Sequence, residues 1–334
     1  MKRRFSRYHG LLLVDKPAEH TSHDLVAIIR RLSGQRRVGH TGTLDPLATG
    51  LMGVLLGEAT RLEPWLVKMD KLYTGRLRLG LSTDTNDLTG RVIAENTGPW
   101  PSEDEIKRRL KALEGQSEQV PPAFSAIKVG GRRAYQAARA GEQLELKARP
   151  VTARRLELLA YQPPEIEFLA EVSSGYYIRS LVRDLGEDLR LGAALTALRR
   201  ERVGGWSVDR AYTLDQLRAW RPEDWTEQVL APAEALPHWP SVTLQNDAER
   251  FFRHGRSVPA PGLGQVGPYK ILNGQGRLIG LAEMFLDDQG AGTALPRLVE
   301  DQPSFGGQSP RRPFLRPLRV FNFGFETEPP DGKE

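Results

Sequence analysis

Apolar residues near the N-terminus gather in short runs that polar turns separate. The run at 11–15 stops at a Lys-Pro pair, which is typical of a short buried strand that ends in a turn. Apolar residues then recur at helical spacing between Thr21, which starts a capping-box motif, and Gly34. This stretch therefore predicts a helix, and a second compact apolar run at 51–56 predicts another strand.

Beyond residue 70 the chain mixes strand-like and helix-like patterns. The alternating stretch 71–81 predicts a strand, and the polar stretch 84–90 predicts a turn. Further helices are predicted at 102–113, 133–139 and 178–189, and further strands at 166–173, 270–273, 277–285 and 318–323. The fold class that these patterns predict is α+β.

A change in composition around 237–241 (PHWPS) predicts a domain boundary. We expect a large domain over 1–237 and a small, β-rich domain over 238–325. Gly, Pro and Gln dominate 287–313, which predicts a mobile loop, and the acidic end at 326–334 predicts a disordered tail.

Charge and cysteine usage narrow the classes of function. The chain has 334 residues, no cysteine and a formal net charge of +5. Without cysteine, disulfides, thiolate metal sites and thiolate nucleophiles are excluded, and a reducing cytoplasm is the expected location. Eight basic and two acidic residues between 128 and 155 give that window a net charge of +6, so the rest of the chain is nearly neutral. A local excess of this kind fits either a phosphate-binding surface or a solvated basic face.

The densest polar cluster is the loop 39–50, GHTGTLDPLATG, which holds His40 and Asp45. Glycines and a proline restrict its backbone, and catalytic residues concentrate in such loops. Taken alone, Asp45 could equally form a turn before Pro46, and His40 could bond a buried carbonyl. The pair His20 and His23 lacks further metal ligands, so no metal site is predicted.

Several longer blocks carry a resemblance to a known family. They are LLLVDKPAEHTSHDLVAIIRR, VGHTGTLDPLATGLMGVLLGEATR, KLYTGRLRLGLSTDTNDLTG, VPPAFSAIKVGGRRAYQAARAG and SSGYYIRSLVRDLGEDLRLGAALTALRR. In this order and spacing they resemble the TruB family of tRNA pseudouridine-55 synthases, over about residues 8–215. The resemblance implies a catalytic domain with a central mixed or antiparallel sheet flanked by helices, followed by a small PUA-like RNA-binding domain.

The resemblance also implies an activity, in which one uridine of the tRNA T-loop is isomerised to pseudouridine without a cofactor. Asp45 would be the catalytic carboxylate, acting as nucleophile or as base. Tyr73 would stack on the target base, and Arg179 would pair with Asp45 and orient it. Tyr177 and Leu198 would line the uracil pocket. His40 would fill the gap that the flipped nucleotide leaves in the T-loop.

Phosphate contacts are implied for the basic segment at about 121–150, which in this family closes over the RNA. The residues concerned are Lys128, Arg132, Arg133, Lys147 and Arg149. Lys16 and Asp87 are further candidates for RNA contacts. Glu19 departs from the family pattern, because a glycine is usual at that position of the DKP turn. A positive φ angle there would be strained for a glutamate.

Two alternatives stay open at this point. The chain could be a guide-RNA-dependent pseudouridine synthase subunit that needs partner proteins, or a tRNA-binding or tRNA-folding protein without catalysis. The leading hypothesis is a stand-alone, monomeric, cytoplasmic enzyme that acts on the T-arm of tRNA, with no obligatory protein partner. No membrane association is expected, since no apolar run approaches the length of a membrane span.

Overall fold

A computed structural model of the chain describes residues 6–125, 127–129, 131–140, 142, 144–287 and 312–321. The chain divides into two units by its internal contacts. The large unit comprises Leu12–Leu56 and Thr60–Val229, and the small unit comprises Met1–Leu11, Gly57–Ala59 and Leu230–Glu334.

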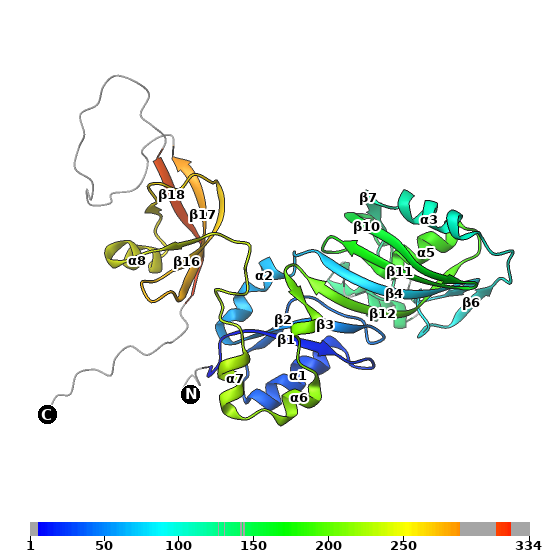
Figure 1. Ribbon diagram of the computed structural model, residues 1–334, viewed down its shortest axis with the longest axis horizontal. Coiled ribbons are helices and arrows are strands. Elements are labelled where there is room, and N and C mark those ends of the chain that lie inside the picture. The colour runs from blue at the N-terminus through cyan, green and yellow to red at the C-terminus, as the bar shows by residue number, and fades with distance from the viewer. Residues whose placement is uncertain are drawn as a thin grey trace, which may run out of the picture. The chain divides into compact units, whose positions relative to one another are not determined.

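The large unit is built on a mixed sheet. In the described part of the chain, nine strands form this sheet in the order β1-β3-β12-β4-β11-β10-β7, with β2 beside β3 and β13 beside β12 (Figure 1). The strands are β1 (Gly10–Lys16), β2 (Val38–His40), β3 (Thr49–Leu56), β4 (Lys71–Leu79), β7 (Gly115–Gln119), β10 (Arg149–Gln162), β11 (Glu165–Val172), β12 (Ala193–Val203) and β13 (Trp206–Ser207). Two residue pairs join β3 to β12, in parallel. In contrast, β4 pairs in the antiparallel sense with β12 along its whole length and with β11 along all but its last residue. The short β3–β12 contact lies directly after the loop that carries Asp45.

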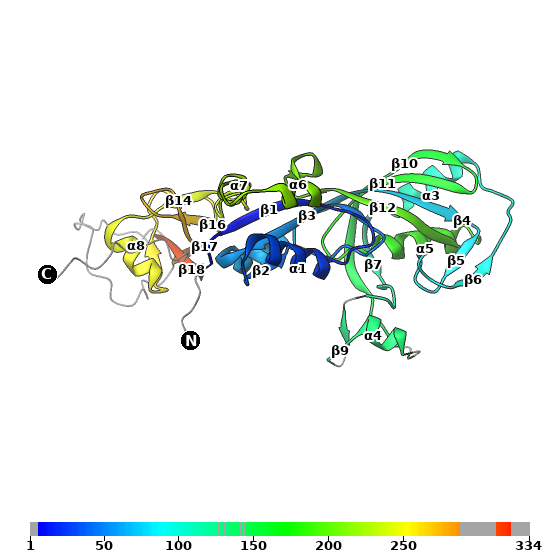
Figure 2. The same cartoon turned by 90° about the horizontal axis from the view of Figure 1, so that it is seen from below.

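Helices cover the sheet, and α1 and α5 lie on the same side of it (Figure 2). The helices of the large unit are α1 (Ser22–Ser33), α2 (Glu63–Leu66), α3 (Glu103–Ala112), α4 (Ala134–Arg139), α5 (Ile178–Asp188), α6 (Leu214–Ala219) and α7 (Pro222–Gln228), with 3₁₀ turns η1 (Gly57–Leu62), which spans both units, and η2 (Val208–Arg210). The predicted capping box of α1 is confirmed. The Thr21 side chain accepts from the Asp24 N–H at 3.0 Å, the Asp24 carboxylate accepts from the Thr21 N–H at 2.9 Å, and Gly34 ends the helix at φ 65°.

The segment between β7 and β10 leaves the sheet where these two strands meet, at the Gln119–Arg149 pair. It contains a small hairpin of β8 (Lys128–Val129) and β9 (Arg132–Arg133), followed by α4. Figure 2 shows β9 and α4 standing out from the sheet on the side of α1 and α5. A second hairpin, β5 (Leu81–Thr83) with β6 (Val92–Glu95), follows β4.

The small unit is rich in strands, as the sequence predicted. Its described residues form a sheet in the order β14-β16-β17-β18-β15, and α8 packs on it. The elements are β14 (Ser241–Thr243), α8 (Asn246–Arg253), β15 (Val258–Pro259), β16 (Gly267–Leu272), β17 (Leu278–Asp287) and β18 (Arg312–Val320). Phe252 and Ile271 are fully buried in its core. The predicted hairpin at 270–285 corresponds to β16 and β17.

The structure differs from the predicted elements at several places. The long strand β10 and the strand β12 lie where no strand was predicted. His40 ends β2 instead of lying in the loop, and the last strand begins at Arg312, before the predicted 318–323. Apart from its ends, which belong to β17 and β18, the loop predicted at 287–313 lies outside the described residues, as does the tail predicted at 326–334.

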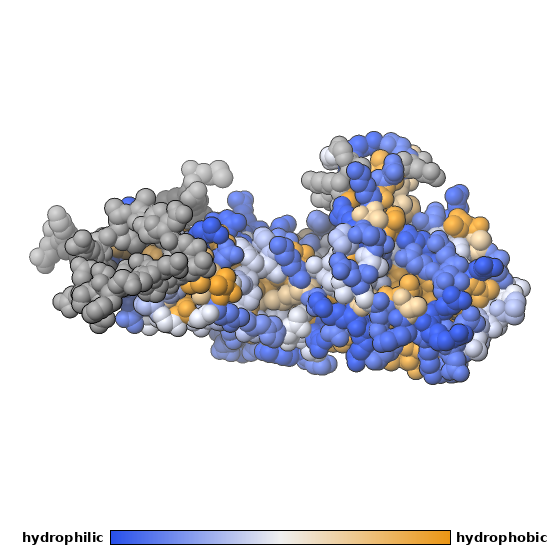
Figure 3. Space-filling model, turned by 90° about the horizontal axis from the view of Figure 1, so that it is seen from above, coloured by the Kyte–Doolittle hydropathy of each residue, from blue (hydrophilic) through white to orange (hydrophobic). Residues whose placement is uncertain are grey.

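Among the described residues, none of the helices is both long and apolar enough to cross a membrane. On the face of the large unit seen in Figure 3, hydrophilic residues cover most of the surface, and apolar residues form separate small patches.

Candidate active site

Asp45 lies in the loop between β2 and β3, and its neighbours hold it on both sides. The buried Ser22 hydroxyl at the start of α1 accepts from the Leu44 N–H at 2.9 Å and donates to the Leu44 carbonyl at 3.2 Å. On the other side, the Pro46 carbonyl accepts from the Glu19 N–H at 2.9 Å. The Asp45 side chain itself is 37% exposed, so a ligand can reach its carboxylate.

Arg179 brings three distant parts of the chain together at this carboxylate. It lies in the first turn of α5, and only 6% of its side chain is exposed. Its Nε donates to the Asp45 carboxylate at 2.8 Å. The two terminal nitrogens donate to the carbonyls of Thr85, at 3.1 Å, and Phe124, at 2.9 Å. The guanidinium thus fixes Asp45 with respect to the turn after β5 and the base of the basic segment.

Asp87, predicted to contact RNA, lies in an enclosed position, and an RNA contact by this residue stays a prediction. Its side chain is 6% exposed and lies 3.6 Å from the Arg179 guanidinium. Its other carboxylate oxygen accepts from the Thr85 hydroxyl and from the N–H and hydroxyl of Thr89, at 2.5–2.9 Å. Asp87 is therefore enclosed by protein groups and faces the same guanidinium that pairs with Asp45.

Tyr73 and Leu198 lie on one face of the sheet. Leu198 on β12 is directly opposite Gly75 on β4, two residues from Tyr73, so the side chains of Leu198 and Tyr73 point the same way. Each residue is 8% exposed. Tyr177 precedes α5 and is half-buried, and burial raises the pKa of its hydroxyl. The phenol of Tyr177 is thus a neutral group beside a charged pair.

His40 ends β2 and its ring is partly buried. Nδ1 accepts from the Gly42 N–H at 3.2 Å, and the ring lies edge-on to that of His23 with the ring centres 6.0 Å apart. Burial lowers the pKa of His40, and the charges of His23 and Arg200 act in the same direction. At neutral pH the imidazole is therefore neutral, with its proton on Nε2.

Lys16, predicted as a candidate for an RNA contact, has protein partners for its ammonium group. The residue is fully buried, and its ammonium donates to the carbonyls of Pro17 at 2.8 Å, His20 at 2.8 Å and Pro46 at 3.4 Å. An ammonium with three carbonyl partners has no donor left for a phosphate. Lys16 instead joins the DKP turn to the loop of Asp45.

Arg200, which the sequence patterns did not single out, anchors the same loop. It is 1% exposed, and its guanidinium donates to the carbonyls of Leu51 at 2.7 Å and of Thr43 and Gly42 at 3.4 Å. In the sequence it stands in an Arg-Arg pair that is typical of a solvated face, so no local signal marks it as buried.

The lowered pKa values of two buried lysines, Lys16 and Lys71, predict how the stability of the protein depends on pH. Burial, together with the nearby charge of Arg200, lowers the pKa of each to about 8 from 10.5. Between pH 8 and 10.5 the folded state therefore binds fewer protons than the unfolded state, and the free energy of unfolding rises with pH. Above pH 10 the raised pKa values of Tyr176 and Tyr177 act in the opposite direction.

We expect each lysine to contribute up to about 1 kcal/mol of stability per pH unit between pH 8 and 10. Urea unfolding at pH 7.5, 8.5 and 9.5 measures this slope. Lys71→Met should lower the slope, whereas Lys111→Met, at an exposed position on α3, should leave it unchanged. A Lys71→Met variant with the slope of the unchanged protein would contradict the expectation.

Glu19 has a left-handed backbone conformation, with φ at 66°, although such a conformation is strained for a glutamate. Its side chain is exposed, and the turn reaches the Asp45 loop through the Glu19 N–H, which any residue except proline supplies. We expect Glu19→Gly to raise the free energy of unfolding by up to about 1 kcal/mol, because glycine adopts this φ without strain. Thermal denaturation measures the gain, and Glu19→Ala, which keeps a Cβ, serves as the control that should not show it.

The basic residues of the segment 121–150 differ in their surroundings. Lys147 and Arg149 are exposed. Arg132 is also exposed, and its guanidinium pairs with both carboxylate oxygens of Glu142 at 2.8 and 3.1 Å. Lys128 and Arg133 lie in the β8–β9 hairpin, directly opposite each other. The phosphate contacts of all five stay predictions.

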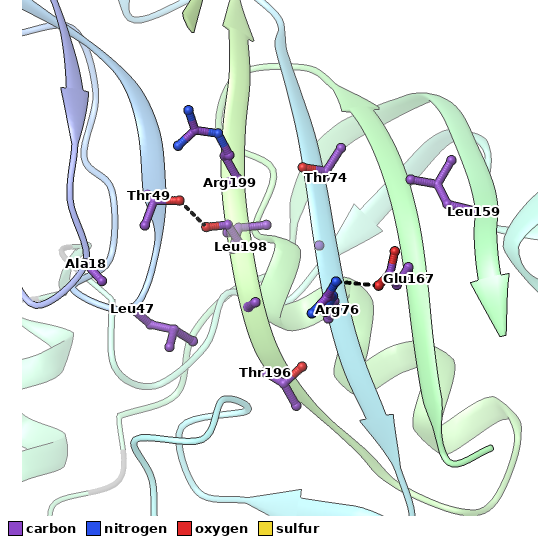
Figure 4. Close-up of a pocket in the computed structure, with 12 residues that line it drawn as sticks. Ala18, Leu47, Thr49, Thr74, Arg76, Leu159, Glu167, Thr196, Leu198 and Arg199 are labelled. Atoms are coloured by element: carbon purple, nitrogen blue, oxygen red, sulfur yellow. Dashed lines mark hydrogen bonds and ion pairs between the residues drawn. The ribbon is translucent and has the colours of Figure 1, made fainter. Parts of the chain in front are cut away.

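A hollow of about 420 Å³ opens on the face of the sheet that carries Thr74 and Arg76 (Figure 4). Arg76 forms an ion pair with Glu167 at 2.7 Å, and the Thr49 hydroxyl donates to the Leu198 carbonyl at 3.4 Å. Of the predicted site residues, only Leu198 is among the described residues that line it. The carboxylate of Asp45 and the guanidinium of Arg179 lie outside this hollow.

Across the described residues, no group of three or more His, Cys, Asp or Glu side chains gathers at a possible metal site.

Comparisons with known proteins identify the class to which this fold and site belong. A family model for the N-terminal domain of TruB family pseudouridylate synthases matches residues 30–178. Models for the tRNA pseudouridylate synthase B C-terminal domain and for the C-terminal region of pseudouridine synthase II TruB match residues 179–236 and 240–290. The class is thus that of the pseudouridine synthases.

Curated relatives agree with the family models. A protein of Thermobifida fusca is 44% identical over 282 residues, which cover 82% of this chain and 94% of the relative. One of Aromatoleum aromaticum is 43% identical over 302 residues, covering 90% and 95%. Both are described as tRNA pseudouridine synthase B. The chain therefore belongs to the TruB family of pseudouridylate synthases, and the predicted resemblance is confirmed.

Solved structures support the fold. A Cbf5–Nop10–Gar1 complex is similar with a TM-score of 0.64 and 27% identity, covering 83% of this chain and 78% of that chain. An H/ACA RNP bound to a substrate RNA containing 2′-deoxyuridine is similar with a TM-score of 0.66 and 23% identity, covering 94% and 85%. The predicted α+β fold class, with a central mixed sheet flanked by helices and a β-rich second unit, is thereby confirmed.

Proposed function

We propose that this chain isomerises uridine 55 in the T-loop of tRNA to pseudouridine, with Asp45 as the catalytic carboxylate. The relatives that span nearly the whole chain are described as tRNA synthases of this kind. The observation that carries the proposal is the ion pair of an accessible Asp45 with a buried Arg179, at 2.8 Å. Such a pair fixes one carboxylate in direction while a ligand can still reach it.

The reaction breaks the bond between ribose C1′ and uracil N1 and forms a bond from C1′ to uracil C5. The C5 proton leaves and N1 gains a proton, so the product has the same atoms and oxidation state as the substrate. A carboxylate can start this sequence as a nucleophile or by removing the ribose 2′ proton. Tyr73 would stack on the base and assist proton transfer at C5. The chemistry requires no metal and no cofactor.

The target base must leave the folded T-loop before Asp45 can act on it. The neutral ring of His40 suits the role of filling the vacated position in the T-loop. Tyr177 and Leu198 would line the pocket around the flipped uracil. Exposed residues of the basic segment, such as Lys147 and Arg149, would bind phosphates and add salt-dependent affinity.

We further propose that the enzyme works as a monomer in the cytoplasm, without an obligatory protein partner. The decisive experiment incubates the purified chain alone with an unmodified T-arm stem-loop and maps pseudouridine by chemical labelling. Modification of the T-loop uridine supports the proposed reaction, its substrate and its independence from partner proteins. Modification at another position would overturn the substrate assignment and leave the reaction class intact.

A second candidate, a guide-RNA-dependent subunit, draws on the likeness to the Cbf5–Nop10–Gar1 complex. The same assay separates the two. If the chain alone leaves the stem-loop unmodified but modifies a target when guide RNA and partner proteins are added, the guide-dependent function holds. If tRNA binds and no pseudouridine forms under any condition, the chain is a tRNA-binding protein without catalysis.

A further inference from the structure

Gln119 is the last residue of β7 and lies at the base of the basic segment. The other four residues of β7 are exposed, whereas Gln119 is 5% exposed. It pairs with Arg149, the first residue of β10, so the segment leaves and re-enters the sheet on either side of this pair. A buried amide side chain at such a position needs partners for both its donor and its acceptor.

Both partners of the Gln119 amide belong to one residue, Tyr177. The Gln119 Nε2 donates to the Tyr177 carbonyl at 3.2 Å, and the Gln119 Oε1 accepts from the Tyr177 N–H at 2.8 Å. The side chain thus binds the main chain of Tyr177 as a neighbouring strand would. Tyr177 occupies the N-cap of α5, and its own side chain makes no cap hydrogen bond. Gln119 therefore fixes the direction in which the chain enters this helix.

The stretch that follows Gln119 is bonded to the first turns of α5 at three more places. The Val120 carbonyl accepts from the Ser180 hydroxyl at 2.9 Å and from the Arg183 guanidinium at 3.2 Å. The Phe124 carbonyl accepts from Arg179, the same guanidinium that holds Asp45. A shift of this stretch along α5 would therefore disturb the Arg179–Asp45 pair.

We propose that Gln119 is a positioning residue that couples the base of the basic segment to the alignment of Tyr177 and of the Arg179–Asp45 pair. The inference rests on the proposed function. This role requires an amide at position 119. A carboxylate could accept from the Tyr177 N–H, but its second oxygen would face the Tyr177 carbonyl oxygen, and two acceptors repel each other. RNA held by the segment is thereby aligned with the catalytic carboxylate. Loss of the Gln119 contacts should impair this alignment and leave the binding of RNA intact.

The test compares Gln119→Glu, which keeps the size of the side chain, with Gln116→Glu, the same change at an exposed position of β7. We expect Gln119→Glu to lower the single-turnover rate on the T-arm stem-loop by about 10- to 100-fold, as small misplacements of reacting groups do. The dissociation constant for tRNA should change by less than about 3-fold, because the phosphate contacts remain. Gln116→Glu should match the unchanged protein in both measurements.

A second variant keeps the test valid if Gln119→Glu fails to fold. Gln119→Met keeps an unbranched side chain without donor or acceptor, and it should show the same fall in single-turnover rate. A normal rate in either folded Gln119 variant, or a fall in affinity without a fall in rate at saturation, would overturn the positioning role. If the unchanged protein forms no pseudouridine in this assay, the proposed function fails, and the two failures are thus distinguished.

Discussion

Asp45→Asn is expected to lower pseudouridine formation by about four orders of magnitude or more, while the variant still binds tRNA. Asparagine keeps the size of the side chain and can still bond Arg179, so the loop should keep its shape. It supplies neither a nucleophilic oxygen nor a base, and losses of this size follow when the group that starts a reaction is removed. Single-turnover labelling of the T-arm stem-loop and a filter-binding titration measure the two quantities.

The matched control is Asp104→Asn, which makes the same charge change at an exposed position in the first turn of α3. It should leave both turnover and affinity within about 2-fold, since exposed substitutions away from a site have small effects. Turnover by Asp45→Asn at more than about a hundredth of the normal rate would rule out Asp45 as the catalytic carboxylate.

The elements that the sequence predicted well are those whose signals are local. The helix between Thr21 and Gly34 has a capping box at one end and a left-handed glycine at the other, and both devices act within one turn. The strand β3 is almost wholly buried, so its continuous apolar run identifies it without knowledge of its partners.

The strands that the sequence missed depend on distant partners. In β10, 14 residues long, most positions are exposed and several are basic, so the local pattern is that of a solvated loop. It becomes a strand because β7 and β11 supply hydrogen bonds on both sides. In β12 the fully buried Arg200 breaks the apolar pattern, and its carbonyl partners in β3 and in the Asp45 loop explain its burial.

The candidate site shows the same difference between local signals and contacts with distant parts of the chain. Loop chemistry marked Asp45 and His40 as candidates, but left a turn aspartate and a structural histidine open. The pairing with Arg179, 134 residues further along the chain, came from the family resemblance, because spacing cannot show such a contact. Lys16 was a candidate for an RNA contact from its place in the DKP turn, and Asp87 was a candidate from the family resemblance. Both side chains are buried, and only the fold reveals their partners, the three carbonyls around Lys16 and the Arg179 guanidinium beside Asp87.

Arg179→Lys is expected to lower the single-turnover rate by about 100- to 1000-fold, the second largest effect in this site. An ammonium can reach Asp45 or one of the two carbonyls, but it cannot span all three directions as the guanidinium does. Asp45 would keep a positive partner and lose its fixed orientation, and orientation contributes strongly to rate. The binding of tRNA should change little, because Arg179 is buried.

Arg179→Met separates orientation from stability. It leaves the buried Asp87 carboxylate and the carbonyls of Thr85 and Phe124 without their partner, which should cost about 3 kcal/mol of unfolding free energy. Arg179→Lys should lose less stability than Arg179→Met and still lose most of the activity. Arg109→Lys, at a half-exposed ion pair on α3, is the control for the substitution itself. If Arg179→Lys loses rate only in proportion to its fraction unfolded, Arg179 stabilises the fold and does not orient Asp45.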